Sequence, residues 1–232
     1  MHILLTRPLE DCSDLIIKFK KLGHSVSHLP LIKIKKIEYG EINFNDFSAI
    51  IFTSSNSIKN LKLDNINKTL KCFCVGSSTE KLARASGFQN VIAADGNVRA
   101  LKELILQNHD KKDGKILYVS GELISFNLEE ELRKEGYEII RIINYSVEHN
   151  DEIKDDLIEE LKKNIPDIVY VYSENSSKSF LNIIKKYQLI DSWMNTNLMC
   201  IGEKTSSVLN EIKWKKIFLF SPGEEEFLLY KV

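Results

Sequence analysis

The stretch "VGSSTEKLARASGFQNV", residues 75–91, predicts a strand end, a glycine turn, a short helix and the start of a new strand. Three hydroxyl residues, Ser77, Ser78 and Thr79, stand where this helix should begin. A single serine or threonine is enough to cap a helix, so three exceed what capping needs. The surplus raises the question of what else these hydroxyls bind.

A second stretch, "IGEKTSSVLNEIKWKKI" at residues 201–217, has the same pattern, with Gly202 matching Gly76 and Thr205 matching Thr79. Both belong to a longer repeat, whose other matches keep the same order along the chain. The matched pairs are "ILLTRP" from Ile3 with "ILYVSG" from Ile116, "AIIFTSSNSIKNL" from Ala49 with "DIVYVYSENSSKSFL" from Asp167, and "CVGSST" from Cys74 with "CIGEKT" from Cys200. The repeat indicates two related halves.

Each half alternates short Val/Ile-rich runs with helical patterns. The runs "AIIFTS" and "DIVYVYS" are almost continuously apolar, which is typical of parallel strands covered on both faces. Gly23, Gly87 and Gly136 follow helical patterns, where helices commonly end. The fold class is therefore α/β, with two doubly wound parallel-sheet domains.

Two extended segments, residues 31–40 and 141–150, lead out of this pattern and are candidates for crossing between the domains. If both cross, the domains are interleaved. We therefore predict one discontinuous domain from residues 1–36 and 147–232, and one inserted domain from residues 38–146. A simple division near residue 115 is the alternative.

The composition excludes several classes of protein. The 232 residues carry a net charge of −1, so no overall field would attract nucleic acid or an anionic membrane. The opening "MHILLTRPLEDC" has too short an apolar run for a signal peptide or a membrane span, which predicts a cytoplasmic protein or a mature soluble chain. The 4 cysteines are too scattered for a disulfide framework or a metal site, and we interpret them as buried thiols.

Ligands of open α/β sheets bind beyond the carboxyl ends of the strands. Hydroxyls, amides and glycines dominate the loops predicted there, which are residues 6–8, 53–57, 76–79, 120–122, 172–177 and 202–205. Helix N-termini attract anions, so the loops predict a ligand rich in carboxylates or phosphates, held between two domains. Helix capping alone is the alternative at each loop. Acidic runs at Glu129–Glu131 and Glu224–Glu226 are interpreted as solvated first turns of helices.

No P-loop, dinucleotide fingerprint, metal-ligand cluster or Ser-His-Asp arrangement is evident in the sequence. The ordered set of motifs nevertheless resembles one family, uroporphyrinogen-III synthase, over nearly the whole chain. The resemblance rests on "LLTRP", "IIFTSSNS", "VGSSTEKLARASGF", "ILYVSG" with "LRKEGYEI", "INYSV", "VYVYSENS", and "CIGEKTSSVL" followed by "WKKI".

The resemblance implies two flavodoxin-like domains joined by a two-stranded β-ladder. It implies a hydro-lyase that cyclises hydroxymethylbilane to uroporphyrinogen III in haem biosynthesis, with loss of water and inversion of the last pyrrole ring. No metal or organic cofactor is implied, and we expect a monomer. The polycarboxylate substrate suits a cleft of hydroxyls and helix N-termini.

The same resemblance assigns roles to particular residues. It makes Tyr145, in "NYSV", the residue that assists loss of the hydroxyl. Ser120 departs from the family, whose bacterial members often carry a basic residue there. The resemblance and the rim loops together give the expected substrate-binding residues, which are Arg7, Thr53, Ser54, Ser55, Ser78, Thr79, Gly121, Ser173, Asn175, Gly202 and Thr205.

Two other functions stay open on the residues alone. One is a non-catalytic, two-lobed module that binds an anionic small molecule. The other is a transferase for phosphorylated sugars, which the hydroxyl loops would also permit. Conversion of hydroxymethylbilane to the type III rather than the spontaneous type I isomer separates the synthase from both.

Overall fold

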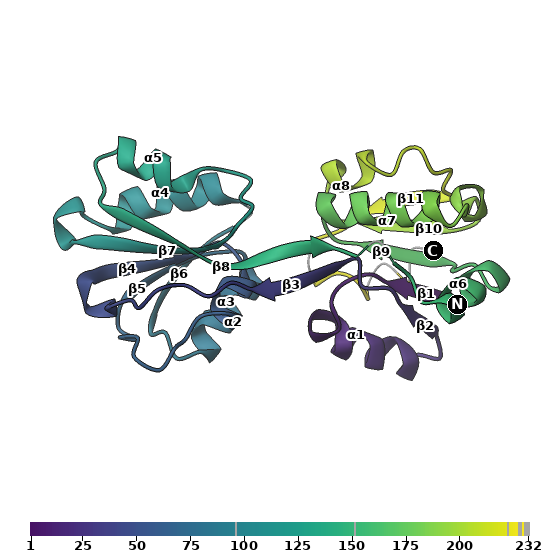
Figure 1. The fold of residues 1–232 in the computed structure, drawn as a ribbon, viewed down its shortest axis with the longest axis horizontal. Helices are drawn as coiled ribbons and strands as arrows, with labels where there is room; N and C mark the ends of the chain where they lie inside the picture. Colours follow the sequence, from purple (N-terminus) through teal and green to yellow (C-terminus); the bar gives the residue numbers. More distant parts are fainter. Residues whose placement is uncertain (96, 151, 222, 227–228, 230–232) are drawn as a thin grey trace. The chain divides into compact units, whose positions relative to one another are not determined.

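The structure is a computed structural model, which describes residues 1–95, 97–150, 152–221, 223–226 and 229 (Figure 1). By internal contacts the chain divides into two compact units. Unit 1 comprises Met1–Lys33 with Glu148–Val232, and unit 2 comprises Ile34–Val147. The domain boundaries given above stay a prediction, because a compact unit defined by contacts need not fold independently.

Unit 1 is built on a parallel sheet with the strand order β11-β10-β9-β1-β2. Its strands are β1 (His2–Leu5), β2 (Ser25–His28), β9 (Ile168–Val171), β10 (Asn197–Cys200) and β11 (Lys216–Leu219). Its helices are α1 (Leu9–Lys21), α6 (Asp155–Lys163), α7 (Glu174–Lys186) and α8 (Glu203–Ser207), with a 3₁₀ turn at Ile190–Trp193.

Alternate residues of these strands enter different cores. Leu4 and Val169 pack in one cluster with Phe180 of α7, whereas Ile3 and Tyr170 pack in another with residues of α1. Helices therefore cover both faces of the sheet, with α1 on one and α6 and α7 on the other (Figure 1). This two-sided burial explains the almost continuous apolar runs in the sequence.

Unit 2 has the strand order β3-β8-β7-β4-β5-β6. Its strands are β3 (Ile32–Lys36), β4 (Phe47–Phe52), β5 (Lys71–Val75), β6 (Asn90–Ala94), β7 (Lys115–Gly121) and β8 (Ile139–His149). Its helices are α2 (Ser55–Lys59), α3 (Ser77–Ala85), α4 (Val98–Asn108) and α5 (Leu128–Lys134), with 3₁₀ turns at Phe44–Asp46 and Lys111–Asp113. Strands β4 to β8 are parallel, and β3 joins the edge.

The predicted α/β class with two parallel-sheet domains and a two-stranded ladder is confirmed. Strands β3 and β8 pair antiparallel, and each contains a point where the chain passes from one unit to the other. Their ladder continues beyond β3, where the Ile37 amide donates to the Asn144 carbonyl at 2.9 Å. At its other end the Asn150 amide donates to the Leu31 carbonyl at 2.9 Å.

The sequence repeat explains why the chain crosses twice. The repeat pairs β1 with β7, β2 with β8, β9 with β4 and β10 with β5, and the two sheets then read β2-β1-β9-β10-β11 and β8-β7-β4-β5-β6. The sheets therefore have equivalent orders. Each unit joins the first part of one repeat to the second part of the other, which requires two connections.

The acidic runs differ in their structure. Glu129–Glu131 lie in the first turn of α5, as expected. The expectation that Glu224–Glu226 begin a helix is wrong, because they lie in a turn. The expectation that they are solvated is wrong for Glu225, which is only 7% exposed. Within the described part of the chain, no helix has the length and apolarity that crossing a membrane requires.

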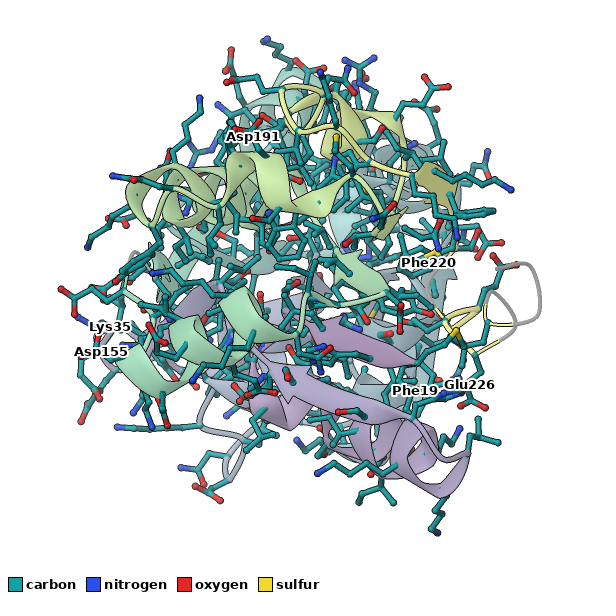
Figure 2. All side chains as sticks on the ribbon, turned by 90° about the vertical axis from the view of Figure 1, so that its right-hand side faces the viewer. Phe19, Lys35, Asp155, Asp191, Phe220 and Glu226 are labelled. Atoms are coloured by element: carbon teal, nitrogen blue, oxygen red, sulfur yellow. The ribbon has the colours of Figure 1, made fainter. Side chains whose placement is uncertain are left out.

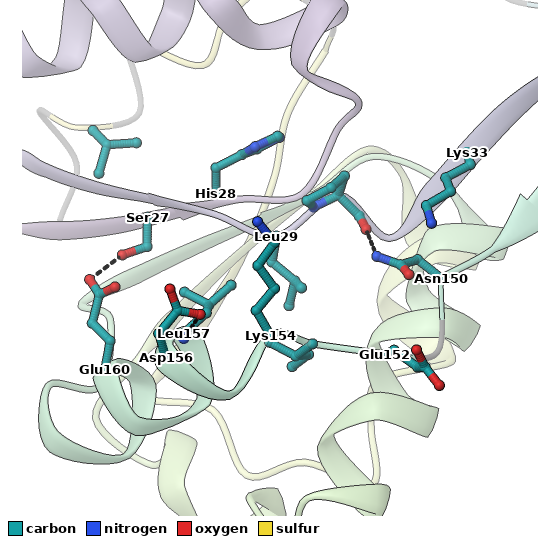
Figure 3. Close-up of a pocket in the computed structure, with 13 residues that line it drawn as sticks. Ser27, His28, Leu29, Lys33, Asn150, Glu152, Lys154, Asp156, Leu157 and Glu160 are labelled. Carbon is teal, nitrogen blue, oxygen red and sulfur yellow. Dashed lines mark hydrogen bonds between the residues drawn. The ribbon is translucent and has the colours of Figure 1, made fainter.

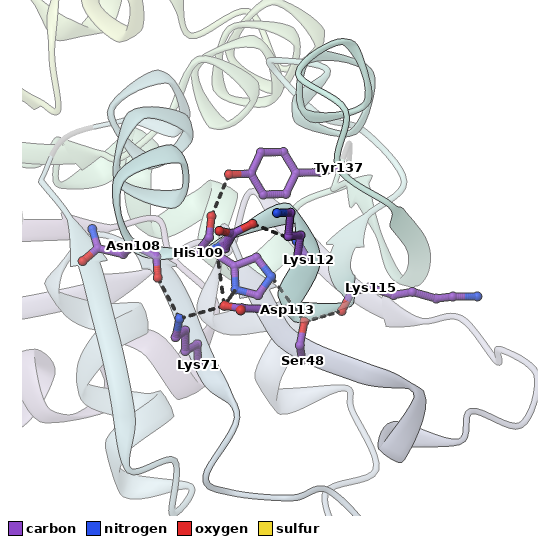
Figure 4. Close-up of polar contacts among 9 residues, drawn as sticks. Ser48, Lys71, Asn108, His109, Lys112, Asp113, Lys115 and Tyr137 are labelled. Atoms are coloured by element: carbon purple, nitrogen blue, oxygen red, sulfur yellow. Dashed lines mark hydrogen bonds and ion pairs between the residues drawn. The ribbon is translucent and has the colours of Figure 1, made fainter.

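At the amino ends of the unit 2 strands, the fold brings together a serine, a histidine and an aspartate that the sequence did not single out (Figure 4). The buried His109 ring lies with Nε2 3.2 Å from Ser48 Oγ and Nδ1 3.6 Å from Asp113 Oδ2. The Ser48 hydroxyl also donates to the Lys115 carbonyl at 3.1 Å. The Ser48 proton is therefore already used in a hydrogen bond, and the cluster lies at the amino ends of the strands, whereas ligands of α/β sheets bind at the carboxyl ends. We therefore interpret the cluster as structural.

Burial lowers the pKa of His109, so the fold favours the neutral ring. The unfolded chain therefore holds more protons below its histidine pKa of about 6.5, and the free energy of unfolding should fall as the pH drops through that range. Above a pH of about 6.5, the stabilisation from the neutral His109 is fully present. We expect His109→Gln to flatten the pH dependence in urea unfolding between roughly pH 5 and 7. An unchanged slope in the variant would contradict the assignment.

Candidate functional site

In unit 2 a pocket of about 160 Å³ opens at the carboxyl ends of the strands. It lies where β7 meets β4, the point at which successive strands begin to add in opposite directions. The pocket is lined by Thr53, Ser54, Val98, Tyr118, Gly121, Leu123, Ile124, Ser125, Phe126 and Tyr145. Four expected site residues, Thr53, Ser54, Gly121 and Tyr145, are thus brought together.

A β-bulge directs Tyr145 into this pocket. Strands β7 and β8 pair Ser120 with Ile143 and then Gly121 with Tyr145, so that Asn144 is an extra residue on β8. The Asn144 side chain is fully buried and donates from Nδ2 to the Ser57 carbonyl at 2.7 Å. Bulges of this kind change the direction of a side chain and often lie beside active sites.

Gly121 is required by the close approach of Tyr145. A Cβ atom at position 121 would lie 2.6 Å from Cζ and 2.9 Å from the hydroxyl oxygen of Tyr145. The Glu122 amide, next along the chain, donates to the Tyr145 carbonyl at 2.9 Å. The tyrosine is therefore held by the turn after β7 at both its backbone and its ring, and the residue as a whole is only 8% exposed.

A second phenol, Tyr118, lines the same pocket. Its hydroxyl lies 3.3 Å from Thr53 Oγ1, and burial raises its pKa, so the group stays protonated. Sequence reasoning missed Tyr118 because the run "ILYVSG" makes it one more apolar strand residue. The apolar walls from Val98 and Phe126 were missed for the same reason.

The pocket thus combines apolar walls with hydroxyl groups. Val98, Leu123 and Phe126 offer packing surface, and Thr53, Tyr118 and Tyr145 offer hydrogen bonds. Such a pocket suits a flat, largely apolar ring whose edge carries hydrogen-bonding groups. Ser54 has a second role, because its Oγ accepts from the Asn56 amide at 3.2 Å and so caps α2. Ser55 is the first residue of that helix.

The two glycine loops of the repeat have almost the same backbone conformation. Gly76 caps α3 with φ 77° and ψ 154°, and Gly202 caps α8 with φ 75° and ψ 163°. Neither helix start has a hydrogen bond from a capping side chain. The expectation that Ser77, Ser78 or Thr79 could cap α3 is therefore wrong. A positive φ selects glycine at both positions, although each has open space around it.

Thr79 and Thr205 are both buried in the first turns of these helices, whereas Ser78 is exposed. The Thr205 carbonyl accepts from the fully buried Ser177 hydroxyl at 2.8 Å. Neither threonine lines the Tyr145 pocket. In unit 1, Ser173 caps α7 through a 3.1 Å bond from the Ser176 amide, as the capping alternative supposes. Asn175 is in the first turn of that helix.

The corresponding edge of unit 1, where β1 meets β9, contains Arg7. Its guanidinium lies 4.5 Å from the centre of the Tyr172 ring, and Nη1 is 3.9 Å from Oε1 of Glu225. The Tyr170 hydroxyl donates to the Glu225 carbonyl at 2.6 Å. Glu226, which Figure 2 labels, follows in the chain. It forms a 2.6 Å ion pair with Lys18 of α1. A carboxylate of the chain itself therefore faces Arg7.

A larger cavity of about 770 Å³ lies beside β2 and α6 in unit 1 (Figure 3). Ser27 donates to Glu160 there at 2.7 Å, and the Asn150 side chain donates to the Pro30 carbonyl at 2.7 Å. Basic and acidic side chains are mixed along its wall, and none of the expected site residues lines it. We place the candidate site at Tyr145 because the carboxyl edge of the sheet is where α/β proteins bind ligands.

Comparison with known proteins gives one family. The family model described as uroporphyrinogen-III synthase HemD matches residues 13–221. The fold is similar to a uroporphyrinogen-III synthetase from Helicobacter pylori, with a TM-score of 0.64 and 17% identity over 100% of this chain and 99% of that one. A mutant uroporphyrinogen III synthase from Thermus thermophilus gives a TM-score of 0.56 and 13% identity over 100% and 97%. The sequence has no significant match among the curated proteins.

The close approach of Gly121 and Tyr145 gives a test of the geometry. Gly121→Ala places a methyl group inside the Tyr145 ring, so the ring or the turn has to move. We expect the free energy of unfolding to fall by about 1–3 kcal/mol, the usual cost of overpacking. Urea denaturation measures the change. Gly40→Ala, where a Cβ meets no atom within 4 Å, is the matched control. Equal stability of both variants would contradict the packing described.

Proposed function

This chain belongs to the uroporphyrinogen-III synthase HemD family, and we propose that it closes linear hydroxymethylbilane to uroporphyrinogen III. In this reaction the terminal carbon–oxygen bond breaks, the last pyrrole ring inverts through a spiro intermediate, and the macrocycle closes with loss of water. The observation that carries the proposal is the pocket at the carboxyl ends of β7 and β4 in unit 2. There the β-bulge directs the Tyr145 side chain toward hydroxyl and apolar groups.

We propose that the pocket holds the ring whose hydroxymethyl group departs. Apolar walls at Val98 and Phe126 suit the faces of a pyrrole, and the hydroxyls of Thr53 and Tyr118 suit polar groups at its edge. The Tyr145 hydroxyl then donates a hydrogen bond to the leaving oxygen, which lowers the cost of breaking the bond. Beyond this step, the main contribution of the protein is to hold the bilane in a closing geometry.

Several groups are available for the substrate carboxylates. Helix α3 begins at Ser77 without a side-chain cap, so its first amides and its positive dipole end can receive an anion. Ser78, Thr79, Gly202, Thr205 and Asn175 belong to the same proposal, at helix starts along the two sheet edges. Arg7 would receive a carboxylate in competition with Glu225. We further propose a cytoplasmic monomer that binds neither nucleic acid nor membrane.

The activity is tested with enzymatically generated hydroxymethylbilane. We expect the wild-type protein to direct the product to the type III isomer, because spontaneous closure without ring inversion gives type I. Product isomers are separated by chromatography after oxidation. A product that stays type I, with tight binding of the bilane, would favour a non-catalytic binding module instead.

Tyr145→Phe removes one hydroxyl and keeps the ring against Gly121. We expect the rate of type III formation to fall roughly ten- to a thousandfold, equivalent to about 1.4–4 kcal/mol of transition-state stabilisation, with some activity remaining. Tyr39→Phe is the matched control. The Tyr39 hydroxyl accepts a 2.8 Å hydrogen bond from the Lys62 amide, and Tyr39 does not line the pocket. Equal rates for the two variants, with equal melting temperatures, would show that the Tyr145 hydroxyl only packs.

Thr79→Ala and Thr205→Ala test the carboxylate contacts. Glycines cap both helices, so these substitutions should not incur the cap loss of about 1 kcal/mol. We expect kcat/KM to fall more than stability does. Steady-state kinetics beside thermal melts separate the two effects. Lower melting temperatures with normal turnover would instead assign the threonines to packing.

A further inference from the structure

Arg141 of β8 binds the turn that follows β7. Its Nε donates to Ser120 Oγ at 2.7 Å, and its Nη2 donates to the carbonyls of Gly121 at 2.8 Å and Glu122 at 3.1 Å. One guanidinium thus joins three successive residues. A rigid fork of donors can make such a set of contacts, whereas the single ammonium of a lysine cannot reproduce its geometry.

This turn is the one that holds Tyr145. Gly121 lies against the Tyr145 ring, and the Glu122 amide binds the Tyr145 carbonyl. The register of β7 and β8 shifts between Ser120 and Gly121, so ladder bonds alone leave the turn weakly fixed at this point. Arg141 precedes the bulge on β8, where it is paired with Tyr118 of β7. Its side chain extends past the bulge to the carbonyl of Glu122.

The charge of Arg141 has no carboxylate partner among the ion pairs of the described residues. Arg141 is half-buried, its guanidinium lies 6.0 Å from the centre of the Tyr118 ring, and the oxygens that it binds are neutral. A surface ion pair is therefore not what keeps an arginine here. The contacts instead serve the shape of the turn.

Unit 1 contains a similar contact between a strand side chain and the turn after the neighbouring strand, at the position that the sequence repeat relates to Arg141. The register pairs Leu5 with His28 in unit 1 and Tyr118 with Arg141 in unit 2, and the sequence repeat relates both pairs by the same shift. His28 Nε2 lies 2.7 Å from the carbonyl oxygen of Arg7, in the loop after β1. In both units a nitrogen-bearing side chain from the neighbouring strand, β2 or β8, therefore holds the turn at the carboxyl end of β1 or β7.

We propose that Arg141 is a positioning residue of the site, which fixes the Tyr145 hydroxyl by holding the Ser120–Glu122 turn. The proposal rests on the proposed function for its catalytic consequence, but the placement of Tyr145 can be measured without any reaction. Displacement of a catalytic group by about 1 Å can cost on the order of a hundredfold in rate. Loss of Arg141 should therefore act on turnover more than on substrate binding.

The first experiment records the NMR signal of Tyr145 in protein labelled with [13Cζ]tyrosine, assigned by its disappearance in Tyr145→Phe. Arg141→Gln should move this signal, and Arg141→Lys should move it less. Arg133→Gln is the matched control, because Arg133 also donates to a backbone carbonyl, that of Ile139 at 3.1 Å, but at the start of β8. An Arg141→Gln signal that stays at the wild-type position would overturn the proposal.

The second experiment measures kcat and KM for type III formation. We expect Arg141→Gln to lower kcat roughly ten- to a hundredfold with KM within about threefold, and Arg141→Lys to recover part of the loss. In the Tyr145→Phe background, Arg141→Gln should have little further effect, because coupled residues are not additive. Additive losses would overturn the proposal.

Two outcomes are kept distinguishable. If the wild-type protein forms no type III product, the proposed function fails, while the NMR signal still decides whether Arg141 positions Tyr145. If Arg141→Gln does not fold, Ser120→Ala removes the Oγ acceptor of the 2.7 Å bond, together with the 3.0 Å bond that this hydroxyl donates to the Gly121 carbonyl, and leaves both bonds from Arg141 Nη2 in place. That variant should move the Tyr145 signal in the same direction and by less, and an unmoved signal there counts against the proposal.

Discussion

The position of β7 between β8 and β4 is the constraint on which the candidate site depends. The strand is buried through residues 116–121, and its carboxyl end marks the place where strands begin to add in the opposite direction. The loop after β7 therefore separates from the loop after β4, and the pocket opens between them. The bulge between β7 and β8 then directs Tyr145 into that opening, and only glycine at position 121 leaves room for its ring.

The equivalent strand of unit 1 is β1, and the two edges have diverged. In unit 2 the edge beside β7 has a pocket, whereas in unit 1 the edge beside β1 receives the turn that carries Glu225. Arg7 therefore has a carboxylate neighbour from its own chain, and burial beside Glu225 raises the pKa of Tyr172 well above its usual value. Duplicated folds can keep their strand order while their carboxyl edges take different roles.

The fold could be predicted further from the sequence than the site could. Apolar runs, helix-ending glycines and the ordered repeat predict strand-and-helix alternation, because each reports local conformation or burial. Tyr118 and Arg141 could not be found in this way, since their roles depend on which strands become neighbours and on a register shift of one residue. Local pattern carries neither fact.

The helix starts show a different limit. Hydroxyls at Ser77 to Thr79 favoured capping by a side chain, but a glycine with positive φ starts the helix instead. His109 and Asp113 are close in the sequence, but Ser48 is 61 residues from His109 and meets the pair only through the order of the strands, which the local sequence does not predict. Glu225 is buried by tertiary contacts that an acidic run does not predict.

In the proposed mechanism, the reacting end of the substrate binds at the Tyr145 pocket. The most direct measurement is a titration of 15N-labelled protein with uroporphyrin III, a stable oxidised form of the proposed product, followed by amide chemical shifts. We expect the largest changes at Thr53, Gly121 and Glu122, beside the pocket and its turn. Changes confined to the cavity beside β2 and α6, with these three amides unaffected, would contradict the mechanism.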